Sequence, residues 1–552
     1  PLYRADYRIR LLRGLESGGM RARLVQRLLP YLSVYVPIYR EVWRLAFPVI
    51  LTNLLMTLVG LVDVLMVGRL GPVEIAAVGM SNTVQLLVTI GILAVTTGSM
   101  ALAAQAQGAR DEARLGFVTK QTLSLTVLMG LALSLVGYVS AEPLLAFLNS
   151  GGEPRAVELG SSYLQIIFLG LTFMVTNFAI SSLMQGAGDT VTPLYLSGSM
   201  NLLNILFNYL FIFGPGPLPE LGVPGAALGT VLSRGLGAVV GLALFASGKN
   251  VIKFLPGSFL PDWGMFRDIL AIGVPSGLQG MVRNSAQLLV IRIVTSTAAG
   301  TYGAAALAIG LQIEALAFMP GLAINVAATS LVGQSLGAWQ VDAARRRGNA
   351  AIGLGVVVMT LIGLPIIVFA PQLVRLFDPS AHPVVVAAST SYLRINALGL
   401  PVLAVAMVVN GALRGAGDTR PGLVGNLLGR WFTVLPLAYV LALRLGFGVT
   451  GVWFALLAGT GVAALYVLRR WRSGEWLEVA LQRSPLYRLH LAGQPEAVRA
   501  AYLREVRTPL MEGPDTLERV DERGVTYERA SERLRVTFGE GGYRLEGGFA
   551  HD

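Results

Sequence analysis

Two acidic residues lie inside long apolar segments of the chain, and their position suggests chemistry. Asp63 lies in LTNLLMTLVGLVDVLMVGRLG, and Glu314 lies in GLQIEALAFMPGL. An ionised carboxylate in a nonpolar environment is costly, so such residues usually face a cavity or a partner. No Lys or Arg lies within one helical turn of Asp63, since Arg69 is six residues away. Asp63 is therefore a candidate for reversible proton binding. The alternative is a carboxyl group that joins two helices by a hydrogen bond.

Side-chain amides recur at helical spacing in the segment NLLNILFNYLFIF. Asn201, Asn204 and Asn208 fall at positions i, i+3 and i+7, which form one helical face. Asn177 and Thr230, in neighbouring apolar segments, could extend this polar surface. The spacing fits either the wall of a polar cavity or hydrogen bonds between helices.

Arginines accompany Glu314 in the second half of the chain, at positions 283, 292, 394 and 430. A glutamate among several arginines is most simply an internal salt-bridge partner. We therefore expect Arg283, Arg292 and Glu314 to form a polar network that fixes the second half.

The pentapeptide GAGDT occurs at residues 186–190 and again at 415–419. It lacks the GxxxxGK[ST] pattern, so it does not indicate a phosphate-binding loop. Glycine can end one helix, Asp or Thr can cap the next, and proline suits the first turn of that helix. The corresponding residues are Asp189, Thr190 and Pro193 in the first copy and Asp418, Thr419 and Pro421 in the second. We predict two tight turns, with both aspartates as helix caps.

The candidate residues above lie in or between twelve apolar segments. Each segment is long enough to cross a bilayer as a helix. The chain has 552 residues, of which 54% are hydrophobic and 14% charged. The segments are roughly residues 45–68, 74–106, 117–141, 160–186, 192–215, 223–247, 269–297, 303–333, 349–372, 388–414, 421–443 and 449–468. We predict an all-α integral membrane protein.

The two sets of six segments are copies of one another. Landmarks of the first set return 227 to 229 residues later: Pro48 as Pro275, Gln105-x-x-Gly108-Ala109 as Gln334-x-x-Gly337-Ala338, Pro193 as Pro421, and GAGDT. An even number of spans keeps both copies in the same orientation, which predicts two lobes related by an axis along the membrane normal. Pro48 is also expected to kink the first helix.

Loop charges predict the orientation. Basic residues gather after the even-numbered segments 2, 6, 8 and 10, at Arg110, Arg114, Lys249, Lys253, Arg345, Arg346, Arg347, Arg414 and Arg420. Fewer lie on the opposite side, at Arg69, Arg155, Arg375 and Arg444. The first side should face the cytoplasm of a cell whose inner (plasma) membrane holds the protein, with both termini inside.

The predicted spans and the loops between them divide the chain into five parts. We expect a cytoplasmic N-terminal segment (1–43), an N-lobe (44–248), a cytoplasmic linker (249–268), a C-lobe (269–472) and a cytoplasmic extension (473–552). The extension is either a solvated tail or a small docking module. Its residues 525–546 have a strand–turn–strand pattern around residues 539–542.

Composition narrows the function. The chain has no Cys, and its three His are not spaced as metal ligands, so neither a disulfide nor a zinc site is indicated. There is no nucleophile motif or His–carboxylate cluster, which argues against an enzyme. The duplicated architecture has no signalling element, which argues against a receptor. The net charge of +11 fits basic loops, so we expect no nucleic acid partner.

The chain from about residue 40 to 470 resembles the multidrug and toxic compound extrusion (MATE) transporters. The resemblance is carried by FPVILTNLLMTLVGLVDVLMVGRLG, the GAGDT turn in both halves, and IEALAFMPGLAINVAATSLVGQSLGA. It implies two six-helix lobes arranged as a V, and export of organic cations and other amphipathic drugs across the lipid bilayer by alternating access. We expect a monomer without a cofactor, with H+ or Na+ as the coupling ion.

Within that family the chain is most similar to the DinF branch. This resemblance implies that Asp63, 15 residues after Pro48, is the coupling carboxylate, with Asn204 and Thr230 as partners. Where that branch has a second Asp, this chain has Asn208. A hard cation prefers charged oxygen ligands, so the departure favours protons over a sodium ion at Asp63. We expect Asp63, Asn177, Asn201 and Asn204 to line the substrate cavity. The alternatives are a sodium-coupled antiporter and a flippase of lipid-linked precursors, whose phosphate would suit the arginines of the C-lobe.

Overall fold

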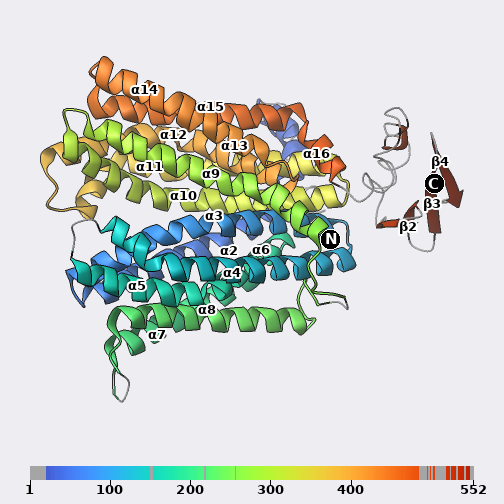
Figure 1. The fold of residues 1–552 in the computed structure, drawn as a ribbon. Coiled ribbons are helices and arrows are strands. Elements are labelled where there is room, and N and C mark those ends of the chain that lie inside the picture. Colours follow the sequence, from blue (N-terminus) through green and yellow to red (C-terminus); the bar gives the residue numbers. More distant parts are fainter. Residues whose placement is uncertain are drawn as a thin grey trace.

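The computed structural model describes residues 20–149, 153–216, 219–254, 257–483, 494, 498, 501–503, 517–521, 524–529, 532–539 and 542–547. The side chains of residues 20–34 are outside this description. Helices account for nearly all of the described residues from 20 to 483. They form two bodies, with the first-half helices in blue to green and the second-half helices in yellow to orange (Figure 1).

The N-lobe consists of seven helices: α2 (Met20–Gly68), α3 (Pro72–Gly108), α4 (Glu112–Leu148), α5 (Pro154–Leu169), α6 (Leu171–Gly186), α7 (Val191–Phe213) and α8 (Gly222–Ala246). Helices α5 and α6 are the two parts of one predicted segment, bent by 51°. Helix α2 begins at Met20, well before the predicted start near residue 45, and is helical through Pro48. The kink expected at Pro48 stays a prediction.

The C-lobe contains α9 (Trp263–Thr295), α10 (Gly300–Gly337), α11 (Val341–Phe377), α12 (Pro383–Gly415), α13 (Arg420–Asn426), η1 (Leu427–Val434), α14 (Leu435–Tyr439), η2 (Val440–Arg444) and α15 (Gly448–Ser473). The segments η1 and η2 are π-helical, so the eleventh predicted span is irregular. Among the described residues, ten helices are long and apolar enough to cross a membrane, and the bent pair makes eleven. Helix α9 corresponds to the seventh predicted segment, residues 269–297. It is not among these eleven, because its arginines make it more polar than the other helices.

Glycine allows the two lobes to approach closely at one end of the bundle. We call this end, which carries residues 186–190 and 415–419, the GAGDT end. A side chain at Gly108 would meet the backbone carbonyl of Gln334, and one at Gly337 would meet that of Gln105. Helices α3 and α10 therefore touch backbone to backbone. The expected duplication is visible here, because each lobe supplies the same motif to the contact.

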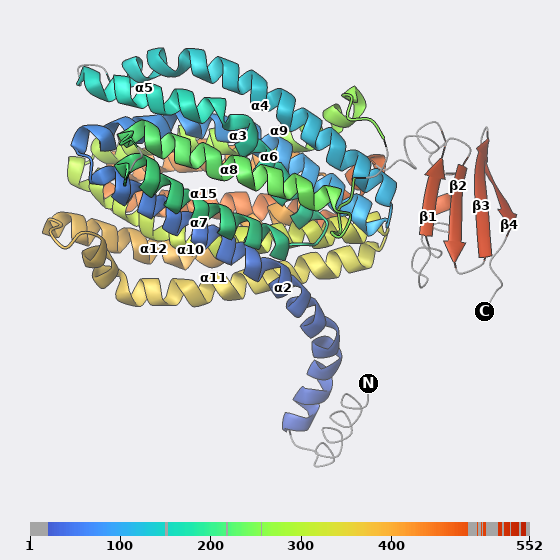
Figure 2. The same ribbon diagram turned by 90° about the horizontal axis from the view of Figure 1, so that it is seen from below.

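Helix α2 contacts both lobes. Near the GAGDT end, Val42, Leu45 and Val49 pack with buried residues of α10, α11 and α12 in the C-lobe. Glu41 adds an ion pair with Arg347, at 3.0 Å. Toward the opposite end, α2 packs against α7 of its own lobe. In Figure 2 the first part of α2 extends beyond the bundle.

The C-terminal extension contains a helix and a small sheet. Helix α16 (Trp476–Gln482) precedes a four-stranded antiparallel sheet in the order β1 (Leu517–Asp521), β2 (Gly524–Arg529), β3 (Glu532–Gly539), β4 (Gly542–Gly547). Gly539 pairs with Gly542, where the sequence predicts the turn. Val525, Tyr527, Leu534 and Val536 are buried in a cluster that includes Trp339 of the turn between α10 and α11. The division of the chain at residues 43, 248, 268 and 472 stays a prediction.

Candidate functional site

A cavity of about 140 Å³ in the N-lobe contains Asp63. Its lining comes from α2, α6, α7 and α8, so residues far apart in the sequence meet there. Four of the predicted residues line it: Asp63, Asn201, Asn204 and Thr230. Both interpretations left open by the sequence therefore hold: Asn201 and Asn204 line the cavity, and Asn204 and Asn208 form hydrogen bonds to other helices.

Hydrogen bonds join these side chains into a chain that ends at the carboxylate. The Asn204 side-chain amide donates to the hydroxyl of Thr230 (3.2 Å) and to the side-chain oxygen Oδ1 of Asn208 (3.5 Å). The Asn208 amide donates to the Asp63 carboxylate (2.8 Å). The path from Asn204 through Asn208 therefore ends with a donor on Asp63, an arrangement that stabilises the ionised carboxylate.

Asn208 suits its position because it is neutral. An aspartate there would place a second carboxylate within hydrogen-bonding distance of Asp63. Two such groups cannot both be ionised without strong repulsion. As an amide, Asn208 both accepts from Asn204 and donates to Asp63, which leaves Asp63 as the only carboxylate among the residues that line the cavity.

Arg234 of α8 lies in the same cavity and corrects one sequence prediction. The sequence shows no cation near Asp63, but Arg234 interacts electrostatically with the Asp63 carboxylate from another helix. No ion pair within 4.0 Å joins the two in the described structure, so the charges face each other across the cavity. Asn177 donates to the Arg234 backbone carbonyl (2.5 Å) and supports α8 instead of lining the cavity.

Tyr163 of α5 extends the site. Its hydroxyl interacts electrostatically with both Asp63 and Arg234, and Gln85 lies beside it. Arg234 could have been found from the sequence, because an arginine inside an apolar segment is as unusual as an aspartate. Tyr163 and Gln85 give no such signal, because tyrosine and glutamine occur in many membrane helices without a functional role.

In the C-lobe, the predicted salt bridge of Glu314 with Arg283 and Arg292 is wrong. Glu314 instead accepts a hydrogen bond from the hydroxyl of Tyr392, and no described arginine lies within ion-pair distance of it. Of the four arginines named from the sequence, Arg430 interacts electrostatically with the Glu314 carboxylate. Helix rotation places Arg283 near other arginines, namely Arg414 and Arg430. Arg292 lies in the last turn of α9 and is exposed.

Of the arginines near Arg283, Arg414 is held by Asn325, whose side-chain oxygen accepts from its guanidinium at 3.4 Å. The Nε of Arg414 is buried without a hydrogen-bond partner in the described structure. The C-lobe thus holds a group of like charges, Arg283, Arg414 and Arg430, and Glu314 interacts electrostatically with Arg430 instead of pairing with Arg283 or Arg292.

The two GAGDT turns have the predicted backbone geometry. Gly188 and Gly417 have φ of 89° and 81°, a conformation that favours glycine. Asp189 caps α7, because its carboxylate accepts from the backbone N–H groups of Val191 (3.1 Å) and Thr192 (2.9 Å).

Asp418 is not the helix cap that the sequence predicts. Its carboxylate pairs with the Nε of Arg470 on α15, at 2.9 Å. The arginine comes from a distant helix that packs beside the second turn, and a guanidinium attracts the carboxylate more strongly than a backbone N–H does.

The two lobes exchange hydrogen bonds through their repeated motifs. Gln105 of α3 donates to the carbonyl of Gly415 (3.0 Å), and Gln334 of α10 donates to the carbonyl of Gly186 (3.0 Å). The glutamine of each lobe therefore binds the GAGDT turn of the other. We call these two hydrogen bonds the glutamine clasp. The sequence shows that both motifs repeat, but it does not show that they bind one another.

No group of three or more His, Asp or Glu side chains within the described ranges could hold a metal ion. The cavity around Asp63 offers one carboxylate, amides, hydroxyls and a guanidinium. Such a set can bind and release a proton, and it can attract or repel a charged organic molecule.

Comparisons with known proteins find relatives that match most of the chain. The MatE family model matches two segments of the chain, residues 48–210 and 275–440. The chain is 30% identical to the probable multidrug resistance protein NorM of Thermotoga maritima over 466 residues, which cover 83% of this chain and 97% of the relative. It is 31% identical to the multidrug resistance protein NorM of Burkholderia vietnamiensis over 445 residues, which cover 78% and 92%.

Solved structures with the same fold include an outward-facing multidrug resistance MATE family transporter of the MOP superfamily. It superposes with a TM-score of 0.72 at 24% identity, covering 81% of this chain and 97% of the other. A MOP superfamily transporter from Pyrococcus furiosus also has a TM-score of 0.72 at 24% identity, covering 80% and 96%.

Proposed function

The chain belongs to the MATE family of membrane transporters, and we propose that it exports organic cations and amphipathic drugs in exchange for protons by alternating access. The family establishes a multi-span transporter and not an enzyme. The observation that carries the choice of ion and cargo is the cavity in which Asp63 faces Arg234, with Asn208 bound to the carboxylate.

Charge in this cavity links the proton to the cargo. When Asp63 is ionised, it balances Arg234, and a cationic drug meets a cavity without net charge and a carboxylate that attracts it. When Asp63 takes a proton, Arg234 is left unbalanced and repels the cation. Proton and drug therefore disfavour each other's binding, which is the condition for exchange.

A proton suits this site better than a sodium ion. Sodium favours several oxygen ligands with negative charge, while the lining of the cavity supplies one carboxylate together with a guanidinium. The DinF-like pattern of Asp63, Asn204 and Thr230 supports the same assignment, with Asn208 in place of a second acid.

Alternating access requires a contact between the lobes that can open. The glutamine clasp and the backbone contacts of Gly108 and Gly337 close the GAGDT end. The loops at this end carry most of the basic loop residues, so we place it in the cytoplasm. In this conformation the Asp63 cavity would be accessible from outside, where a proton enters and the drug leaves.

A second candidate function is favoured by the arginines of the C-lobe. The group Arg283, Arg414 and Arg430 would bind the phosphate of a lipid-linked precursor better than a cationic drug. Proteoliposomes distinguish the candidates, because the flippase would bind a labelled lipid pyrophosphate and would not move a cationic dye.

The test of the proposed function is efflux of a cationic dye from proteoliposomes under an imposed pH gradient or sodium gradient. We expect efflux with the pH gradient alone and none with Asp63→Asn. Asp378→Asn, which removes an exposed carboxylate that binds Ser380, should transport normally. Efflux that follows sodium, or full activity of Asp63→Asn, would overturn the proposal.

A further inference from the structure

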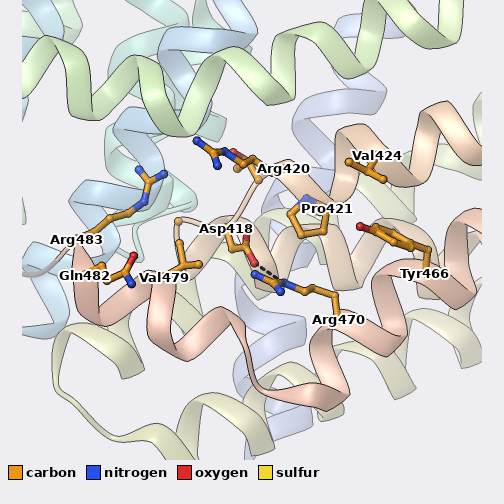
Figure 3. Close-up of a pocket in the computed structure, with 11 residues that line it drawn as sticks. Asp418, Arg420, Pro421, Val424, Tyr466, Arg470, Val479, Gln482 and Arg483 are labelled. Atoms are coloured by element: carbon orange, nitrogen blue, oxygen red, sulfur yellow. Dashed lines mark hydrogen bonds and ion pairs between the residues drawn. The ribbon is translucent and has the colours of Figure 1, made fainter. Parts of the chain in front are cut away.

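A second cavity lies at the GAGDT end, outside the Asp63 site. It has a volume of about 380 Å³ and lies between the second GAGDT turn, α15 and α16. Roughly this volume is typical of small-ligand sites in proteins. Figure 3 shows the residues that line it, which come from the C-lobe and from the first helix of the C-terminal extension.

The charges of this cavity are predominantly positive. Arg420, Arg470 and Arg483 line it, and Asp418 is the only carboxylate among its lining residues. Asp418 is already paired with Arg470, which also pairs with Glu475. The side chains of Arg420 and Arg483 extend away from this pair in Figure 3.

The arginines differ in their surroundings. The guanidinium of Arg420 is exposed and, within the described part of the chain, has no hydrogen-bond or ion-pair partner. Arg483 follows the end of α16 and contacts the turn, since its Cδ lies 3.0 Å from the Cβ position that a side chain at Gly417 would take. The guanidinium fork matches phosphate geometry.

Apart from Thr419 and Gln482, the rest of the lining is mainly apolar. Pro421 and Val424 of α13, Tyr466 of α15 and Val479 of α16 form this part. A simple inorganic anion would leave their surface exposed, whereas a phosphate attached to an organic group would use both parts of the cavity. We propose that this cavity binds an organic phosphate, with its phosphate on Arg420 and Arg483 and its organic part against Val424 and Tyr466.

The position of the cavity connects it to the contact between the lobes. Thr419 lines it and donates a hydrogen bond to the carbonyl of Ile272 on α9, at 2.6 Å. The same turn supplies the Gly415 carbonyl that Gln105 binds. A ligand that joins this turn to α16 stabilises the turn in the conformation of the clasp, so the site would regulate opening of the GAGDT end.

The test is isothermal titration calorimetry of the full chain in detergent with two probes. Adenosine 5′-monophosphate represents a soluble phosphate, and dihexanoyl phosphatidylglycerol represents a lipid headgroup. We expect at least one probe to bind, and the tighter of the two identifies the source. Arg420→Gln and Arg483→Gln should each weaken binding by about tenfold, the effect of losing one charge-assisted hydrogen bond. Arg472→Gln, an exposed arginine on α15 outside the lining, should bind as the unmodified chain does.

A second variant tests the volume of the site without removing charge. Val424→Trp should fill the cavity and abolish binding of both probes while every arginine is retained. Absence of binding by both probes, or equal binding by Arg420→Gln and the unmodified chain, would overturn the proposal. Dye efflux measured without the probes tests the proposed transport separately, because the second cavity shares no residue with the Asp63 cavity.

Discussion

Removal of the glutamine clasp should open the GAGDT end of the transporter. The double variant Gln105→Ala/Gln334→Ala deletes the two hydrogen bonds of the glutamine clasp, each at 3.0 Å, and retains the hydrogen bond from Ser330 of α10 to the Gly186 carbonyl at 3.1 Å. A hydrogen bond of this kind contributes about 1 kcal/mol net, so the pair contributes about 2 kcal/mol to the closed conformation. Since about 1.4 kcal/mol corresponds to a factor of ten, the ratio of closed to open molecules should fall about 30-fold.

Electron paramagnetic resonance distances across the GAGDT end measure this ratio. The chain has no cysteine, so spin labels attach only at introduced positions. E112C and D342C place labels on exposed residues in the first turns of α4 and α11, one on each lobe. The distance distribution of the double variant should shift toward longer separations.

A matched control removes a similar hydrogen bond within one lobe. Gln279 of α9 donates to the carbonyl of Thr419, at 3.4 Å, so it contacts the same turn as Gln105 without joining the lobes. Gln279→Ala should leave the distance distribution unchanged. If the clasp double variant behaves like this control, the two hydrogen bonds do not determine closure and the reasoning is refuted.

Three further predictions concern the cavity, the turns and the contact between lobes. The Arg234→Gln variant should bind a cationic dye about tenfold more tightly and export it poorly. Without the Arg234 guanidinium, protonation of Asp63 no longer leaves a positive charge in the cavity that repels the dye. Equal dye affinity of the variant and the unmodified chain, measured by fluorescence titration, would contradict this. Asp418→Ala should lower the thermal unfolding temperature more than Asp189→Ala does. Loss of Asp418 leaves the half-buried Arg470 without this ion-pair partner, whereas loss of the Asp189 helix cap costs about 1 kcal/mol. Scanning fluorimetry that gives the opposite order would count against this prediction. Gly337→Ala should prevent closure, because its methyl group would overlap the Gln105 carbonyl, and unchanged label distances at the GAGDT end would disprove this.

Local patterns in the sequence determined most of the fold. Segment length and hydropathy predict the spans, and the returning landmarks predict the duplication, which the two matches of the MatE family model support. Asp63 and the asparagine face follow from helical periodicity, and the turns follow from the conformational preference of glycine at 188 and 417. The spans, the asparagine face and the turns depend on neighbours within a few residues, and the duplication is a repeat in the order of residues, so the sequence contains all of them directly.

Only the tertiary structure decided which side chains meet. Arg234 faces Asp63 from another helix, Asp418 pairs with Arg470 instead of capping α13, and Glu314 binds Tyr392 instead of Arg283 or Arg292. Each partner is set by the rotation and depth of one packed helix against another. A rotation of a fraction of a turn would exchange these partners while the spacing within each helix stayed the same, so residue spacing alone could not identify them.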